Sequence, residues 1–493
     1  MDTILNTPPP PKYKHPKEMY SLALVVTLER FAYYGTTTLL LVYIVTQLHF
    51  NETKGYAVFG TFAALAFGLP LFCGVISDKI LGKRKSLIWG CLLHVVGLSC
   101  IVLPYNFTFF VGLSVFVIGN GFFGGIYKAL LGDFYKPEDT AGKDAGFTIT
   151  YGLFNAGIAI GAIICGYVGQ QINWRLGFAV AAFGALLSLV SMLRGIKTHH
   201  GRPADEMKLK KNVLPGITLE ALVYILTLPA IGLLVLVFKF PAVMDLVLLP
   251  LSIVSFAYVI YLSFGYSRSE RYKIFASLIA FIVWLIYTAL YEQTSGSFNL
   301  FVVRNMDMHV GSVLLPGLAI NNFLPGFLPA IIMPLMLIIW KRLNRVGMEP
   351  GTMMKFVISF LLMGAFFGSF WWGCKLYAGT GMVPVFFLFG GYILLEFSEL
   401  CIGPIVYALT YKLAPNAIVG TMMGVLGLAA ASGEYLASKI GNLTTVPANI
   451  TDPVKTLPYY TKIYGGIALW SIGIAVVFAL LLPLMKKLMQ DVK

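Results

Sequence analysis

The sequence predicts an all-α membrane protein with fourteen transmembrane helices. Its 493 residues are 58% hydrophobic and only 12% charged, a composition unlike that of soluble globular or disordered chains. Apolar runs of roughly 20 residues recur throughout, which is the length a helix needs to cross a bilayer. A transmembrane barrel would show short alternating segments instead.

Six apolar runs precede a polar, basic linker at 194–212, whose Gly, Pro and charged residues favour irregular structure. The runs lie at 19–47, 55–77, 85–104, 107–133, 145–170 and 174–194. Two extra runs follow at 217–238 and 242–265. Six more complete the chain, at 273–302, 313–340, 352–376, 381–411, 417–441 and 460–485.

This order predicts three units. Residues 1–196 form an N-terminal six-helix bundle, 197–270 contain the linker and the two extra helices, and 271–493 form a C-terminal six-helix bundle. Two bundles around a central site are typical of secondary transporters, which bind substrate near the midplane between their halves.

The basic residues predict the orientation. With the N-terminus taken as cytoplasmic, 26 Lys and Arg residues fall on the inside and 7 on the outside. Such an excess on the cytoplasmic side supports fourteen helices with both termini in the cytoplasm. The net charge of +14 therefore reflects membrane topology, and no nucleic-acid partner is expected.

Other classes of site find little support in the sequence. The six cysteines lie in or beside apolar runs and lack metal-ligand spacing, so neither a disulfide framework nor a metal site is expected. Nothing resembles a nucleotide-binding loop. No helix offers a nucleophile beside a base, so we do not expect an enzyme, and no cofactor other than a coupling proton is expected.

Glu29 and Arg30 form an adjacent acid and base inside the first apolar run, followed by Tyr33 and Tyr34. Charges at membrane depth are costly and by default indicate a functional site facing a polar interior. Side chains three or four residues apart share one helix face. Arg30 and the two tyrosines are therefore expected to line one cavity wall, with a purely structural ion pair as the alternative.

Further charges lie inside the apolar runs, and each is costly unless it is protonated, paired or hydrated. They are Lys128, Glu292, Glu396, Glu399 and Glu434. Buried carboxylates that exchange partners favour proton coupling. For Glu396, a structural and a functional role are equally compatible with the sequence. His94 is interpreted as a packing residue, because no second ionisable group accompanies it on its helix.

The loop between the second and third runs reads Asp78-Lys79-Ile80-Leu81-Gly82-Lys83-Arg84-Lys85. It resembles the DxxLGxR loop of the major facilitator superfamily. The resemblance implies a cytoplasmic gating latch in which Asp78, Gly82 and Arg84 take part.

Further blocks resemble the proton-dependent oligopeptide transporters, a branch of that superfamily with two extra helices in prokaryotes. Glu29-Arg30-Phe31-Ala32-Tyr33-Tyr34-Gly35 is similar to the family's ExxERFxYYG motif. Similar blocks surround Asn155, Glu292 and Glu399. The resemblance implies that Asn155 contacts peptide, that Glu292 is linked to protons, and that Glu399 receives a peptide's amino terminus.

The sequence departs from the family pattern at the expected coupling pair. Val26 replaces the first acid of ExxER, and Gly124 replaces the expected fourth-helix lysine. Lys128 lies one turn beyond Gly124, so we hypothesise that it replaces the missing base and pairs with Glu29 or a substrate carboxylate. Gly433-Glu434 also replaces the common Gly-Asn, and Leu426 an aromatic residue, which is expected to make the cavity more anionic and to reshape one wall.

The predicted function is proton-coupled import of di- and tripeptides or peptide-like solutes by alternating access. Arg30, Tyr33, Tyr34, Asn155, Lys128, Glu399 and Glu434 are the predicted substrate-binding residues, and Glu29, Glu292, Glu399 and Lys128 the predicted proton-coupling residues. The alternatives are transport of a non-peptide polar or anionic metabolite in either direction, and a substrate sensor. A monomer in a bacterial inner membrane is expected.

Overall fold

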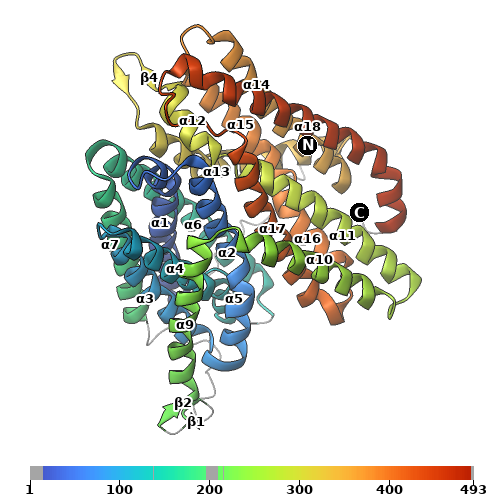
Figure 1. The fold of residues 1–493 in the computed structure, drawn as a ribbon. Helices are drawn as coiled ribbons and strands as arrows, with labels where there is room; N and C mark the ends of the chain where they lie inside the picture. Colours follow the sequence, from blue (N-terminus) through green and yellow to red (C-terminus); the bar gives the residue numbers. More distant parts are fainter. Residues whose placement is uncertain (1–14, 137, 196–208, 215, 490–493) are drawn as a thin grey trace.

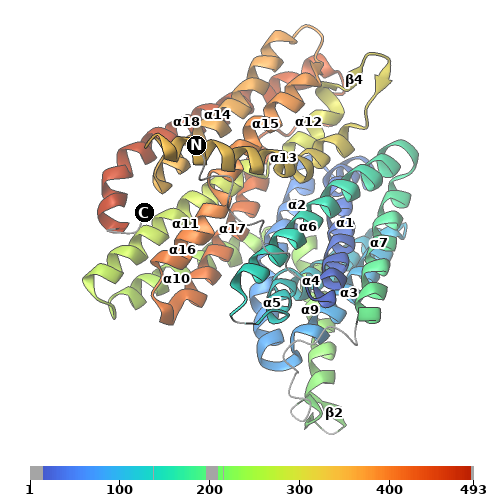
Figure 2. The same cartoon turned by 180° about the vertical axis from the view of Figure 1, so that it is seen from behind.

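The computed structural model describes residues 15–136, 138–195, 209–214 and 216–489. Residues 1–14 and most of the predicted linker, at 196–208, lie outside the described residues. Within them the chain is predominantly helical and forms two bundles with a pair of long helices between them in the sequence (Figures 1 and 2). The prediction of an all-α fold is confirmed.

The N-terminal bundle contains long helices and two short π-helical turns. Its elements are α1 (Lys17–Thr46), α2 (Glu52–Ile76), η1 (Ser77–Leu81), α3 (Lys83–Val102), α4 (Asn106–Phe123), α5 (Ile126–Asp133), α6 (Thr140–Tyr167), η2 (Val168–Ile172) and α7 (Trp174–Arg194). Asn51 caps α2 by accepting a hydrogen bond from the Lys54 N–H, which satisfies one of the free donors at a helix start.

The C-terminal bundle is connected by short strands at one end. Its elements are α11 (Arg268–Tyr291), α12 (Ser297–Asn305), β3 (Met306–Asp307), β4 (His309–Val310), β5 (Val313–Leu314), α13 (Gly317–Arg345), α14 (Thr352–Leu376), β6 (Val383–Pro384), α15 (Phe386–Leu400), α16 (Gly403–Leu413), η4 (Asn416–Ile418), α17 (Val419–Asn442) and α18 (Pro453–Met489). β3 pairs parallel to β6, and β4 and β5 form a hairpin.

The two extra helices contact different bundles. The hairpin of β1 (Asn212–Leu214) and β2 (Ile217–Thr218) leads into α9 (Leu219–Lys239), and α10 (Val243–Ser263) follows. α9 packs on α2 and α4, whereas α10 packs on α11 and α17. The Ser252 hydroxyl of α10 lies 2.7 Å from the Ser432 hydroxyl of α17. The pair therefore connects the two halves along their outer surface.

Thirteen helical segments of the described chain are long and apolar enough to cross a membrane. α1 is the additional long helix, with 30 residues, and it is less apolar because Glu29, Arg30 and several Tyr and Thr residues interrupt its apolar sequence. It packs against α6 and α7, and most of its side chains are buried. With α1 included, the predicted fourteen spans are present.

Three of the spans are interrupted. α4 and α5 separate at Gly124 and Gly125, and α11 and α12 at 292–296. α15 ends at Leu400, and α16 begins at Gly403 with Pro404 in its first turn. Irregular backbone at membrane depth is tolerated where it is buried in protein or lines a cavity. Two of these interruptions place Glu292 and Glu399 beside the contact between the bundles.

The bundles meet where α2 packs on α17 and α6 on α13. Tyr56 and Thr444 are hydrogen-bonded across this contact at 3.0 Å, and Gln170 accepts a bond from the Leu318 N–H at 3.1 Å. The contact lies at the end of the molecule away from β1 and β2, and the bundles diverge toward the β1–β2 end (Figures 1 and 2). That end carries the loops that the sequence predicts to be cytoplasmic.

Candidate functional site

A cavity of about 250 Å³ lies between the two bundles. The N-terminal bundle contributes Tyr33, Tyr34, Thr37, Phe59, Phe62, Ala63, Phe67, Tyr151, Phe154, Asn155 and Ile158. The C-terminal bundle contributes Tyr291, Glu292, Thr294, Ser295, Asn322, Pro325, Pro329, Glu396, Glu399 and Glu434. A cavity whose walls belong to different bundles changes shape when the bundles move, as alternating access requires.

The wall from the C-terminal bundle is acidic. Glu292 follows the end of α11, Glu396 and Glu399 lie three residues apart on α15, and Glu434 lies on α17. The Tyr291 hydroxyl donates to Glu396 Oε1 at 3.4 Å. Within the described part of the chain, neither Glu396 Oε2 nor Glu434 Oε1 has a hydrogen-bond partner, although both residues are buried. Four carboxylates thus converge on one small space.

The opposite wall is mainly aromatic. Tyr33 stacks on Phe62 with ring centroids 6.0 Å apart, and Phe154 lies 6.4 Å from Tyr34 and 6.1 Å from Tyr151. Asn155 is held by a hydrogen bond from its Nδ2 to the Tyr151 carbonyl at 3.0 Å. The structure thus brings the predicted residues Tyr33, Tyr34 and Asn155 to the cavity.

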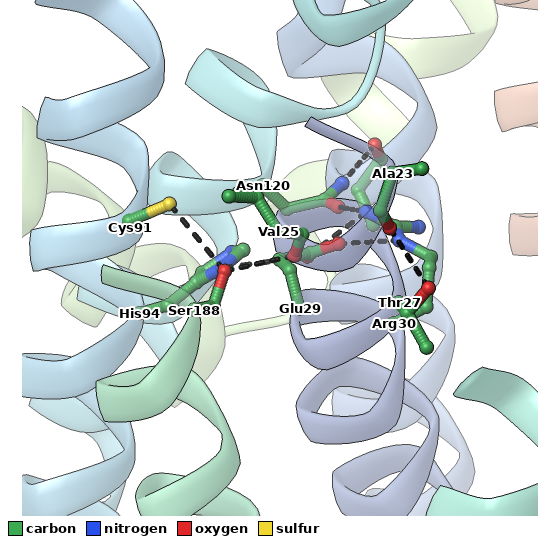
Figure 3. Close-up of polar contacts among 10 residues, drawn as sticks. Ala23, Val25, Thr27, Glu29, Arg30, Cys91, His94, Asn120 and Ser188 are labelled. Carbon is green, nitrogen blue, oxygen red and sulfur yellow. Dashed lines mark hydrogen bonds and ion pairs between the residues drawn. The ribbon is translucent and has the colours of Figure 1, made fainter. Parts of the chain in front are cut away.

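Arg30 and Glu29 form a buried ionic cluster beside the cavity, shown in Figure 3. Arg30 donates to both carboxylate oxygens of Glu29, at 2.5 and 2.9 Å, and to Asn120 Oδ1 at 3.2 Å. Asn120 in turn donates to the Ala66 carbonyl at 2.8 Å. Neither charged residue is among the described residues that line the cavity, so Arg30 does not share the wall predicted for it with Tyr33 and Tyr34.

Aromatic rings cover the Arg30 guanidinium. Its central carbon lies 5.0 Å from the ring centroid of Tyr33, 5.3 Å from that of Phe154 and 5.7 Å from that of Phe123. Such contacts stabilise a cation away from water. Together with the pair to Glu29, these contacts hold Arg30, a predicted substrate-binding residue, beside the cavity.

His94, which the sequence indicates only as a packing residue, lies beside Glu29. It is 1% exposed, and its Nδ1 lies 3.4 Å from Glu29 Oε1 (Figure 3). The inference that no ionisable group accompanies His94 considered only its own helix, whereas Glu29 reaches it from α1. Its ring also packs 4.8 Å from Phe116. No pattern along α3 indicates this contact, because the partner comes from another helix.

The predicted pairing of Lys128 with Glu29 is wrong. Lys128 is exposed, and its Nζ lies 5.8 Å from the ring of the neighbouring Tyr127. Glu29 is 1% exposed and already contacts Arg30 and His94. Helical spacing put Lys128 on the face of Gly124, but α5 begins only after the chain turns at Gly124 and Gly125. A contact from Lys128 to a substrate carboxylate stays a prediction.

An ion pair that no sequence pattern indicates joins the two bundles. Arg304 of α12 lies 2.5 Å from Glu52 of α2, and it also donates to the Tyr460 hydroxyl at 3.2 Å. The second Glu52 oxygen accepts from the Val446 N–H at 3.1 Å. Both residues lie at helix ends, where charges are common, so no sequence signal distinguished them.

The loop predicted to act as a latch contains the π-helical turn η1. Gly82 has φ of 77°, a left-handed conformation that favours glycine, and its N–H donates to the Ser77 carbonyl. Lys83 pairs with Asp133 at 2.7 Å and Lys85 with Glu220 at 2.6 Å. In the described chain, Asp78 and Arg84 form no ion pair, so the latch role of Asp78, Gly82 and Arg84 stays a prediction.

Leu426 is fully buried in the C-terminal core and is not among the described residues that line the cavity. The expectation that its substitution reshapes the cavity wall is therefore wrong, because its side chain faces the bundle interior. Most of the lining residues were not among the predicted binding residues, and the polar ones among them include Glu396, Tyr151, Tyr291 and Asn322.

Comparison with known proteins identifies the same family as the sequence motifs. The profile of the POT family matches residues 85–463. Dipeptide and tripeptide permease B of Salmonella typhimurium is 27% identical over 493 residues, covering 98% of each chain. Dipeptide and tripeptide permease A of Cronobacter turicensis is 27% identical over 489 residues, covering 98% of this chain and 95% of the relative.

Solved structures share the fold. A mutant peptide transporter POT in complex with alafosfalin has a TM-score of 0.84 at 23% identity, covering 97% of both chains. Tetrameric PepTSo2 has a TM-score of 0.82 at 23% identity, covering 95% of this chain and 98% of that one. The predicted transporter fold is confirmed, while the monomeric state stays a prediction. The candidate spans and the bacterial relatives support a multi-pass protein of the inner membrane. Because the family profile covers most of its length, the chain belongs to the POT family.

Proposed function

We propose that the protein imports di- and tripeptides, or solutes that resemble them, by proton-coupled alternating access. The observation that carries this proposal is the cavity between the bundles, because it combines four buried carboxylates with an aromatic wall from the other bundle. The permease names of its curated relatives support the substrate class. Transport, and not catalysis, is the activity proposed, with the proton as coupling ion.

The residues divide between two proposed roles. Glu292 and Glu399 exchange protons with the cavity, because a carboxylate in a poorly hydrated site is readily neutralised and is ionised again when water or a cation reaches it. Tyr33, Tyr34 and Asn155 position the substrate from the other wall. Glu399 and Glu434 hold amino groups.

Arg30 and Glu29 contribute in a different way. Since Arg30 lies behind Tyr33 and is paired with Glu29, the pair acts on the cavity through the aromatic wall in the conformation seen here. A change of conformation that separates Arg30 from Glu29 would free the guanidinium for an anionic substrate group and the carboxylate for a proton.

Uptake by purified protein in liposomes tests the proposal. Labelled di- and tripeptides should accumulate when the outside is made acidic, and an ionophore that collapses the proton gradient should abolish accumulation. Glu292→Gln and Glu399→Gln should each abolish accumulation because a neutral amide cannot release a proton. Glu349→Gln is the matched control, since Glu349 pairs with Lys355 outside the cavity at 2.8 Å. Peptide accumulation independent of the gradient would refute proton coupling.

A further inference from the structure

The cavity has an unbalanced charge. Glu292, Glu396, Glu399 and Glu434 line it, whereas none of the described lining residues is Lys, Arg or His. Arg30 precedes Tyr33 and Tyr34 of the aromatic wall, but its charge is paired with that of Glu29, and it also donates a hydrogen bond to Asn120. The site therefore presents acceptors for positive charge without a fixed base for a carboxylate.

The acids are arranged as two groups. Glu396 and Glu399 share α15, where three-residue spacing puts side chains on one face. Glu434 of α17 and Glu292 at the end of α11 come from two helices that pack against each other. Two groups on different helices match a ligand with two separated cationic centres better than a ligand with one.

Two carboxylate oxygens indicate that a ligand is needed. Glu396 is 0% exposed and Glu434 is 3% exposed, yet Glu396 Oε2 and Glu434 Oε1 have no hydrogen-bond partner among the described residues. A buried polar atom without a partner is costly, and an ammonium group supplies three N–H donors. One unpartnered oxygen belongs to each acid group.

The opposite wall suits the same kind of ligand. Phe62, Phe154 and three tyrosines line this wall of the cavity, and aromatic rings attract Lys and Arg side chains as well as other organic cations. The apolar surface of these rings also suits the alkyl chain that separates two amino groups. Both walls therefore favour positive charge, although through different interactions.

We propose that this transporter selects substrates with two cationic nitrogen groups, and this inference rests on the proposed transport function. A dipeptide with a basic side chain carries one cation at its amino terminus and one on the side chain. A linear diamine carries the same two groups without a peptide bond. Each cationic group contacts one acid group, while an acidic side chain meets only like charge.

Binding to the purified protein tests selectivity without a proton gradient. Isothermal titration should compare Ala-Lys, Ala-Ala, Ala-Glu and 1,4-diaminobutane. Ala-Lys is expected to bind about tenfold more tightly than Ala-Ala, as one added charged contact implies, and Ala-Glu more weakly than both. If 1,4-diaminobutane binds as tightly as Ala-Lys, the two cationic groups alone account for binding. If it binds more weakly than Ala-Lys, the peptide group also contributes to binding.

Variants identify the acids responsible. Glu434→Gln and Glu396→Gln should each lower the ratio of Ala-Lys to Ala-Ala affinity, while Glu349→Gln should leave that ratio unchanged. Size-exclusion profiles report whether each variant folds. If a variant does not fold, the affinities of the wild-type protein for the three dipeptides still test the selectivity. Equal wild-type affinities for Ala-Lys, Ala-Ala and Ala-Glu would overturn the inference.

Uptake separates this inference from the proposed function. If Ala-Lys binds selectively but no peptide accumulates under a proton gradient, transport fails and cation selectivity stands. If the three dipeptides accumulate and bind equally well, transport stands and cation selectivity is overturned.

Discussion

The ion pair between Glu52 and Arg304 provides a quantitative test of how the bundles are held together. Glu52→Gln removes the charge and retains an oxygen that can accept from the Val446 N–H. The Glu52 side chain is 5% exposed and that of Arg304 is 27% exposed. Exposed pairs contribute about 0–1 kcal/mol, and breaking a buried pair costs about 3–5 kcal/mol. For this intermediate site we expect about 2 kcal/mol.

That loss has a measurable effect on the population of conformations. A change of about 2 kcal/mol alters an equilibrium roughly 30-fold, since about 1.4 kcal/mol corresponds to a factor of ten. Suppose that about 1% of wild-type molecules have the bundles separated at this end. In Glu52→Gln, that population would rise to roughly a quarter of the molecules. The pair therefore favours the conformation in which α2 and α12 are in contact.

Double electron–electron resonance, which measures distances between two spin labels, can detect this shift. Spin labels are attached to cysteines that replace Tyr105 in the N-terminal bundle and Val313 in the C-terminal bundle, whose side chains are 66% and 58% exposed. The partly exposed Cys100 is first replaced by serine so that it is not labelled. Glu52→Gln should add a longer-distance population. Asp245→Asn is the control, because the Asp245–Lys439 pair is about half exposed, at 49% and 47%. Identical distance distributions in the wild type and Glu52→Gln would refute the reasoning.

Three further predictions concern packing and burial. Glu29→Gln leaves Arg30 buried without its carboxylate, so the free energy of unfolding should fall by about 3–5 kcal/mol, seen as a lower Tm; an unchanged Tm would show that the pair is not structural. Asn120→Leu removes hydrogen bonds to Arg30 and the Ala66 carbonyl and should cost about 1–3 kcal/mol, measured by the same melting assay, whereas a more stable variant would contradict that bonding. Ser252→Cys with Ser432→Cys should form a disulfide on oxidation, since the hydroxyls are 2.7 Å apart; a gel shift after protease cleavage between α10 and α17 detects it, and failure to cross-link would contradict the packing of these helices.

The positions of the spans follow closely from the sequence because bilayer thickness sets both the length and the composition of a crossing helix. Trp174–Arg194 and Thr352–Leu376 coincide with the predicted runs at 174–194 and 352–376. The Gly403-Pro404 break also follows from local chemistry, since proline cannot continue a helix and is favoured at a helix start.

Which buried acids face the cavity was decided by tertiary packing. Glu29 and Glu434 look alike in the sequence, as acids inside apolar runs. In the structure Glu434 lines the cavity, whereas Glu29 turns toward Arg30 and His94. Helical periodicity identifies residues that share a face, but it does not identify what another helix brings to that face.

The sequence by itself determined an all-helical membrane protein of two bundles, its family and the presence of costly intramembrane charges, because these depend on hydrophobic length, local motifs and residue type. Only the tertiary structure decided that Glu52 pairs with Arg304 and that His94, in place of the predicted Lys128, lies beside Glu29. Each of these contacts joins segments far apart in the chain, and the free energy of a charge depends on the groups that surround it in space.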